Sequence, residues 1–295
     1  MRAAVAQAPR IAQPAGMARP CIADDIATVS ALCRDLGLGD VTPLPLKAAH
    51  HTTLAIPSLA MVARVQSAEP VDEAWQRAVD EIAVARHLAR RSAPAIAPFG
   101  EWAGPHVADT SVVTFWPYFE ARPAEEHDAM HVAASLGALH DALSDYVCPL
   151  PPYTAALDRC WSVLVGERGS GGLAEDDRAL LMRHHRRLRG EAEKRASPWV
   201  PLHGDVHLGN FLVGSSSALW IDFEDACRGP REYDIAGLPP ETWSHFANTD
   251  LALVAVFADL RSVSVAIWCL VDYARNAEIR EAAAYHLGRI KGWAD

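Results

Sequence analysis

Residues 202–210 read Leu-His-Gly-Asp-Val-His-Leu-Gly-Asn, and residues 219–223 read Leu-Trp-Ile-Asp-Phe. These two stretches contain the densest grouping of polar side chains in the sequence. The segment between them is apolar on both sides of Gly214-Ser-Ser-Ser217, so the pattern predicts two short strands, Phe211–Val213 and Ala218–Ile221, joined by a turn. A hairpin of this kind would bring the residues before and after it to the same end.

Three oxygen-bearing side chains around this hairpin have a spacing that indicates phosphoryl-transfer chemistry. Asp205 is followed five positions later by Asn210, and Asp222 lies twelve positions further on. Phosphoryl transfer needs a carboxylate that accepts or orients a hydroxyl proton, and oxygen ligands for a magnesium ion that bridges the phosphates. A turn rich in Asp and Asn would account for Asp205 and Asn210. It would not account for Asp222, because an unpaired charge at the end of an apolar strand is costly.

The two stretches resemble the H-G-D-x-x-x-x-N and I-D-F signatures of the aminoglycoside phosphotransferase and choline-kinase-like family, whose members are related to the protein kinases. The resemblance implies an α+β, two-lobed protein-kinase-like fold with a small antiparallel-sheet N-lobe and a mainly helical C-lobe. It also implies that Asp205 is the catalytic base and that Asn210 and Asp222 are magnesium ligands. Asp234, in the part of the chain that follows, would brace the catalytic loop.

The resemblance extends to the first part of the chain. Met61-Val-Ala-Arg-Val65 is similar to the strand that carries the phosphate-contacting lysine, and Arg64 occupies that position here. Arginine keeps the positive charge but grips phosphate with a different geometry. Since an arginine in an apolar strand needs a counter-charge, we expect an ion pair with Glu81 on a helix predicted from Val71 to Arg91, with Glu73 as the alternative.

Three more positions acquire expected roles from the same resemblance. The turn Lys47-Ala-Ala-His-His-Thr-Thr53 would cover the phosphates, although it lacks the glycines of a Gly-rich loop. Val113-Thr-Phe-Trp-Pro117 is similar to the connector between the lobes, where the backbone around Trp116 would bind adenine. His207 would either hydrogen-bond within the catalytic loop or reach a phosphate.

Together, these features imply an enzyme that uses ATP and Mg²⁺ to transfer the γ-phosphate of ATP to a hydroxyl of a small molecule. Family members phosphorylate aminoglycosides, macrolides, choline, homoserine and methylthioribose, and no residue selects among them. A cationic antibiotic such as an aminoglycoside is one candidate acceptor, and a small metabolite of the choline, homoserine or methylthioribose type is the alternative. A catalytically weak nucleotide-binding pseudokinase is a further alternative, because Arg64 and the Gly-free turn depart from the family pattern.

A rival from another class uses some of the same residues. His203-x-Asp205 is similar to the first two ligands of an iron site, with His245 or His286 as a distant third ligand. Such a site requires a β-rich scaffold, whereas the second half of this chain has helical patterns. The iron alternative also leaves Asn210 and the second aspartate without a role.

The element pattern predicts a loose lead-in over residues 1–22, an N-lobe over 23–115 and a C-lobe over 116–295. Strands followed by helices are typical of an α+β arrangement. The expected helices are Ala23–Leu36, Val71–Arg91, His127–Ser144, Ala174–Ala196 and two from about Asp250 to Gly292, and the expected strands outside the hairpin are Val41–Leu46, Thr52–Ile56, Ala60–Val65, Ala95–Glu101 and Ser111–Phe115.

Charge restricts the classes of partner. The net charge of the 295 residues is −10; residues 1–115 contribute −1 and residues 116–295 contribute −9. An acidic protein is repelled by nucleic acids and by anionic membranes, so neither is an expected partner. The acidic second half suits a cationic acceptor, and it also serves solubility.

The remaining patterns indicate a cytoplasmic protein. The six cysteines are scattered without a C-x-x-C pair, which indicates reduced, mostly buried thiols. The apolar stretch Leu251–Leu270 contains Asp259 and Arg261 near its middle, which favours a buried helix over a membrane span. Two further predictions concern burial: His184-His185 would lie on a solvated helix face, and four tryptophans would be core residues, Trp75, Trp102, Trp161 and Trp268.

Overall fold

The computed structural model describes residues 21–48, 51–67, 70–166, 174–195, 198–271 and 277–293. Most of the expected lead-in, residues 1–20, lies outside these ranges. Ala49 and His50, in the turn expected to cover the phosphates, also lie outside them. The chain forms two compact units: the first unit comprises Met1–Arg122 and Leu212–Glu224, and the second comprises Pro123–Phe211 and Asp225–Asp295.

The first unit is built on a five-stranded antiparallel sheet with the strand order β1-β2-β3-β5-β4. In the central pair, Arg64 of β3 lies opposite Thr114 of β5. The strands are β1 (Leu44–Ala48), β2 (Thr52–Ile56), β3 (Met61–Gln66), β4 (His106–Ala108) and β5 (Ser111–Pro117).

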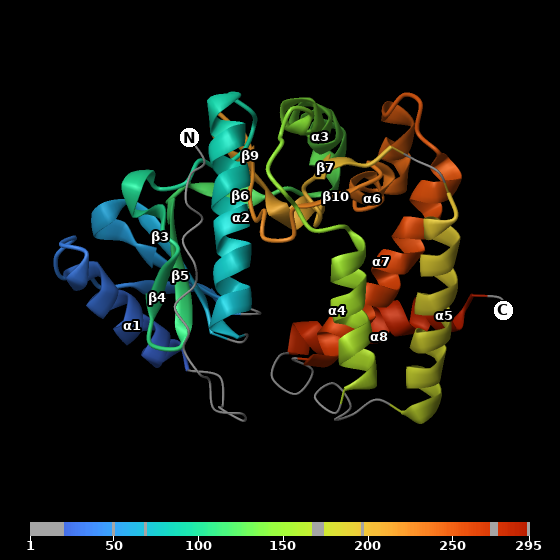
Figure 1. The fold of residues 1–295 in the computed structure, drawn as a ribbon, viewed down its shortest axis with the longest axis horizontal. Coiled ribbons are helices and arrows are strands. Elements are labelled where there is room, and N and C mark those ends of the chain that lie inside the picture. Colours follow the sequence, from blue (N-terminus) through green and yellow to red (C-terminus); the bar gives the residue numbers. More distant parts are fainter. Residues whose placement is uncertain are drawn as a thin grey trace. The chain divides into compact units, whose positions relative to one another are not determined.

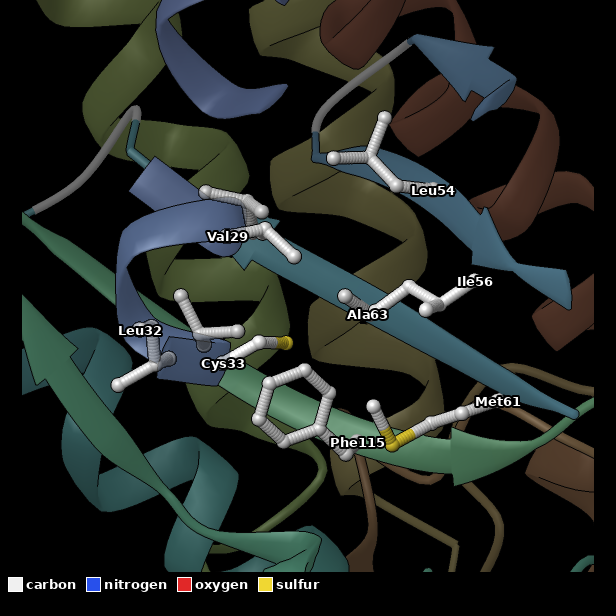
Figure 2. Packing of buried hydrophobic residues seen from close by; sticks show 10 residues of the cluster. Val29, Leu32, Cys33, Leu54, Ile56, Met61, Ala63 and Phe115 are labelled. Atoms are coloured by element: carbon white, nitrogen blue, oxygen red, sulfur yellow. The ribbon is translucent and has the colours of Figure 1, made fainter. Parts of the chain in front are cut away.

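One face of this sheet is covered by helix α1 (Ile22–Asp35). Figure 2 shows Val29, Leu32 and Cys33 of the helix directed toward side chains of three strands. On β3 the residues on this face are Met61, Ala63 and Val65, all fully buried. Because successive side chains of a strand point to opposite faces, this arrangement places Arg64 and Gln66 on the other face of the sheet.

The opposite face is covered by the long helix α2 (Val71–Arg90), which confirms the helix predicted from Val71 to Arg91. Val71, Ala74 and Ala78 of α2 form a small apolar cluster with Val112 of β5. α1 and α2 therefore lie on opposite sides of the sheet (Figure 1). Arg64 is therefore directed toward α2. This helix carries Glu81, which is next to the buried Ile82 in the sequence.

The predicted hairpin is confirmed. Its strands are β8 (Phe211–Gly214) and β9 (Ala218–Trp220), and the amide of Gly214 donates to the Ser217 carbonyl oxygen over 2.9 Å at the turn. With β6 (Ala121–Pro123), they form a three-stranded sheet in the order β6-β8-β9.

The second unit is mainly helical. Its helices are α3 (Ala129–Leu143), α4 (Thr154–Val165), α5 (Glu175–Glu193), α6 (Glu232–Ile235), α7 (Leu251–Val271) and α8 (Ala277–Lys291), and its strand pair is β7 (Val200–Leu202) with β10 (Cys227–Gly229). The α+β architecture predicted from the sequence is confirmed, with an antiparallel sheet in one unit and helices in the other.

Helix α7 is the apolar centre of the second unit, where it packs against α4, α5, α6 and α8 (Figure 1). Its stretch Leu251–Cys269 has the length and composition of a membrane span, but half of it is buried within the protein. A core helix passes the same criteria, so this feature is weak evidence for a membrane.

Four expectations about local structure and burial were wrong. Ala95–Glu101 is not a strand, since Pro94 and Pro98 cannot donate to a ladder; it contains an isolated bridge at Ala95 and runs into a 3₁₀ turn. His184 and His185 are buried, because they share the inner face of α5 with Leu181 and Leu188. The four tryptophans expected in the core are half-buried: Trp75, Trp102, Trp161 and Trp268. Only half of the six free cysteines are buried, namely Cys33, Cys160 and Cys227, whereas most were expected to be.

Candidate active site

The segment between β7 and β8 adopts a conformation that requires glycine. Gly204 has a φ of +88°, and a Cβ added there would clash with the carbonyl oxygen of Asp225. Both facts exclude a larger residue without backbone movement. Gly204 therefore fixes the path of the chain immediately before Asp205.

The same segment is anchored by the fully buried Asp234 of α6. The backbone amides of His203 and Gly204 each donate to this carboxylate over 2.9 Å. His140 of α3 contacts its Oδ2 through Nε2 over 2.8 Å. Burial alone would raise the pKa of Asp234, but these hydrogen bonds and the nearby histidines His140 and His203 hold it below its ordinary value. Asp234 thus braces the backbone of the loop, as the family resemblance implied.

Asp205 is surrounded by hydrogen-bond donors. Arg261 of α7 donates to its Oδ1 over 2.8 Å, and Asn210 donates to its Oδ2 over 3.2 Å. His207 Nε2 lies 3.5 Å from Oδ2. Burial would raise the pKa of Asp205, but the opposing effect of Arg261 and His207 is larger and brings it well below its usual range. The carboxylate is therefore ionised at neutral pH.

In the first unit, Arg64 lies among three carboxylates. Its guanidinium is 2.6 Å from Glu81 Oε1, 3.1 Å from Asp222 Oδ1 and 2.8 Å from Glu224 Oε2. The predicted ion pair with Glu81 is confirmed, whereas the alternative partner, Glu73, is exposed on α2.

This group carries more negative than positive charge. Burial would lower the pKa of Arg64, but the three carboxylates raise it far above its ordinary value. For Glu81, burial and the other two carboxylates raise the pKa, which Arg64 opposes. One guanidinium thus faces three acidic groups, and Asp222 and Glu224 alone exceed its charge by one negative charge when Glu81 is protonated. A divalent cation would remove this excess.

The backbone at Asp222 supports a functional role for its side chain. Its φ of +69° lies in the left-handed region, which Asp enters more readily than most residues but still at a cost. Such conformations persist where the surrounding structure imposes them.

These residues fit a magnesium ion that is held jointly with a nucleotide. Magnesium in kinases is bound by one or two carboxylates together with substrate phosphates, and not by an all-protein cage. Asp222 and Glu224, both in the first unit, would supply the carboxylates. Within the described ranges, no three or more His, Cys, Asp or Glu residues form a metal-binding group. The iron alternative with His245 or His286 therefore lacks its ligand set there.

A comparison with known protein families identifies the family of the chain. A model of the phosphotransferase enzyme family matches residues 57–275, nearly three quarters of the chain. The chain belongs to the phosphotransferase enzyme family. It is accordingly an enzyme of the small-molecule kinase class. No curated protein matches its sequence.

Three solved structures illustrate the fold of this phosphotransferase. A choline/ethanolamine kinase family protein from Mesorhizobium loti is 16% identical, with a TM-score of 0.60 over 91% of this chain and 93% of the other. An amicoumacin kinase in complex with AMP-PNP, Ca²⁺ and Ami is 12% identical, with a TM-score of 0.65 over 92% of this chain and 96% of the other. An aminoglycoside 2'-phosphotransferase bound to GDP is 14% identical, with a TM-score of 0.60 over 90% and 97%. At these identities the likeness shows a common kinase-like fold and nothing finer.

Two residues expected to contact nucleotide have clear structural positions in the phosphotransferase. Trp116 lies in β5, where all of Val113–Pro117 is strand paired with β3. Its indole is almost fully buried and donates to Thr114 Oγ1 over 3.0 Å. His207 precedes the turn that ends at Asn210. The backbone N–H of Asn210 donates to the His207 carbonyl oxygen over 3.0 Å. Their roles in nucleotide binding remain predictions.

Sequence reasoning missed three residues of the candidate site. Glu224 follows Asp222 by two positions, and that short spacing of carboxylates was a usable signal. His140 and Arg261 gave a weaker signal, because each lies far along the chain from its partner. A lone arginine in an apolar helix still indicates a buried counter-charge.

Proposed function

We propose that this phosphotransferase transfers the γ-phosphate of ATP to a hydroxyl group of a small molecule, with Asp205 as the catalytic base. The observation that carries the proposal is the state of Asp205: it is ionised, it accepts hydrogen bonds from fixed donors, and it lies on a loop that the buried Asp234 anchors. A carboxylate held in this way accepts or orients the hydroxyl proton of an acceptor.

Asp222 and Asn210 are the proposed magnesium ligands, and Glu224 is a further carboxylate ligand. When bound with the nucleotide, magnesium neutralises charge on the phosphates. Arg64 keeps a positive charge beside these carboxylates and takes the role of the usual lysine, while Glu81 holds its guanidinium in place. The AMP-PNP and GDP in two structures of the same fold support a nucleotide substrate.

The proposed acceptor is a small hydroxyl compound. A cationic aminoglycoside is the first candidate, and a small metabolite of the choline, homoserine or methylthioribose type is the alternative. The net charge of −9 over residues 116–295 supports a cationic acceptor. Neither nucleic acid nor a membrane is a proposed partner, and the proposed location is the cytoplasm.

ADP release from magnesium-ATP tests this function across a panel of an aminoglycoside, choline, homoserine and methylthioribose. We expect one class of acceptor to raise ADP release well above the rate with water, and ³¹P NMR to detect a phosphate monoester. Failure of every compound to raise the rate, together with undetectable binding of magnesium-ATP, would reject the proposal. ATP binding without turnover would favour the pseudokinase alternative, which the arginine at position 64 motivates.

A further inference from the structure

Helix α7 contains two charged residues in an otherwise apolar and small-polar sequence, Asp259 and Arg261. Asp259 pairs with Arg289 of α8 over 3.1 Å, and this pair is partly exposed. Arg261 instead reaches Asp205, 56 residues away in the sequence. An arginine in such a helix loses packing and hydration unless a partner compensates, so its contact with the proposed base needs an explanation.

The donors to Asp205 come from two different parts of the second unit. Asn210 and His207 belong to the same loop as Asp205 and contact Oδ2, so they move with the loop. Arg261 contacts Oδ1 and belongs to α7, a helix outside the loop. Contacts to both oxygens from independent elements fix the rotation of the carboxylate, which donors from one loop cannot do alone.

Helix α7 is itself firmly placed at this point. Leu260 and Val263, on either side of Arg261, are almost fully buried. One turn earlier, Phe257 packs edge-on against Tyr233 of α6, with ring centroids 5.3 Å apart. Tyr233 precedes Asp234, the residue that anchors the backbone of the loop. The loop is therefore held at its backbone by α6 and at its reactive side chain by α7.

We infer that Arg261 is a positioning residue for the phosphoryl-transfer reaction, an inference that rests on the proposed function of Asp205. Its guanidinium orients the Asp205 carboxylate toward the acceptor hydroxyl. An ionised carboxylate has about four acceptor positions, so Arg261, Asn210 and His207 leave capacity for the incoming hydroxyl. Misplacing a reacting group by about 1 Å can cost on the order of 100-fold in rate, which sets the size of the expected effect.

The test compares Arg261→Gln, Arg261→Lys and the control Arg289→Gln. The control breaks the ion pair between Arg289 of α8 and Asp259 of α7. Asp259 lies two positions before Arg261, so the control also removes an arginine–aspartate contact of α7. Rates of ADP release are measured with magnesium-ATP and water alone, and with each compound of the acceptor panel. We expect Arg261→Gln to lower kcat roughly 10- to 100-fold while the KM for ATP changes less than about twofold. Arg261→Lys should recover part of kcat, and Arg289→Gln should keep it.

A second measurement separates positioning from a purely structural role. In the Asp205→Asn background, adding Arg261→Gln should lower the residual rate by less than about twofold, because the group that Arg261 orients is already impaired. Thermal unfolding of each variant identifies those that fail to fold. If Arg261→Gln is folded and keeps wild-type kcat, the positioning role is wrong while the proposed function stands. If the wild-type protein releases no ADP from magnesium-ATP, either with water alone or with any panel compound, the proposed function fails and the positioning role fails with it.

Discussion

The two charged clusters of this phosphotransferase both pair arginine with carboxylates, but their charge balance is opposite. In the first unit, one arginine faces three carboxylates, Glu81, Asp222 and Glu224. In the second unit, one carboxylate, Asp205, faces an arginine, an asparagine and a histidine. The first cluster is short of positive charge and the second is not. The excess of carboxylates supports the proposed cation site in the first cluster, whereas the second cluster holds a single carboxylate in a defined orientation.

The largest effect is expected at the second cluster. Asp205→Asn removes the proposed base while it keeps the size and hydrogen-bonding shape of the side chain. We expect kcat to fall by about 1,000-fold or more, because general-base assistance and orientation are both lost. ATP affinity, measured by titration calorimetry, should change less than about threefold, since this residue acts on the acceptor. A near wild-type rate would remove the base from the mechanism.

Asp222→Asn tests whether the first cluster binds a cation. Losing a carboxylate there should weaken magnesium-dependent ATP binding by at least about tenfold, and turnover should fall with it. Titrating Mg²⁺ at fixed ATP should show a higher requirement than in wild type. Glu73→Gln, on the exposed side of α2, is the matched loss of a carboxylate and should leave the requirement unchanged. Equal magnesium requirements in wild type, Asp222→Asn and Glu73→Gln would contradict the proposal that Asp222 is a magnesium ligand.

Arg64→Met tests the charge balance of the first cluster through stability. The substitution leaves three carboxylates without their shared cation, and breaking such a buried pair costs about 3–5 kcal/mol. Thermal denaturation should show a large loss for Arg64→Met, and Mg²⁺ should raise its unfolding temperature more than it raises that of wild type. A variant as stable as wild type in metal-free buffer would show that the three carboxylates do not depend on this arginine.

The smallest effect concerns Asp234, which anchors the second cluster. Its pKa in the folded protein lies below the ordinary value of 3.8. The stability gained from ionisation is therefore fully present above about pH 4 and is lost as the pH falls through the lower folded value. Comparing unfolding temperatures between pH 6 and pH 3, wild type should lose more stability than Asp234→Asn. Parallel curves would mean that this carboxylate has the same pKa in the folded and unfolded protein.

Much of the first unit was predictable because its signals are local. The alternation on β3 separates Ala63 from Arg64 by face, and the helical spacing on α2 leaves Glu81 on the inner side. The hairpin between Asn210 and Asp222 follows from two apolar runs around a Gly-Ser-rich turn. In contrast, Ala95–Glu101 has an apolar composition but contains proline, and there the missing amide donors decided against a strand.

The sequence by itself determined the family signatures and the α+β architecture, and it reduced the partners of Arg64 to Glu81 or Glu73, because these features depend on the pattern within one element or between adjacent ones. Only the tertiary structure decided that His140 meets Asp234 across 94 residues and that Arg261 meets Asp205 across 56. It also decided that His184 and His185 are buried. The physical reason is common to these cases: which face of a helix is inner, and what a distant side chain touches, are set by how helices pack and not by the pattern along any one of them.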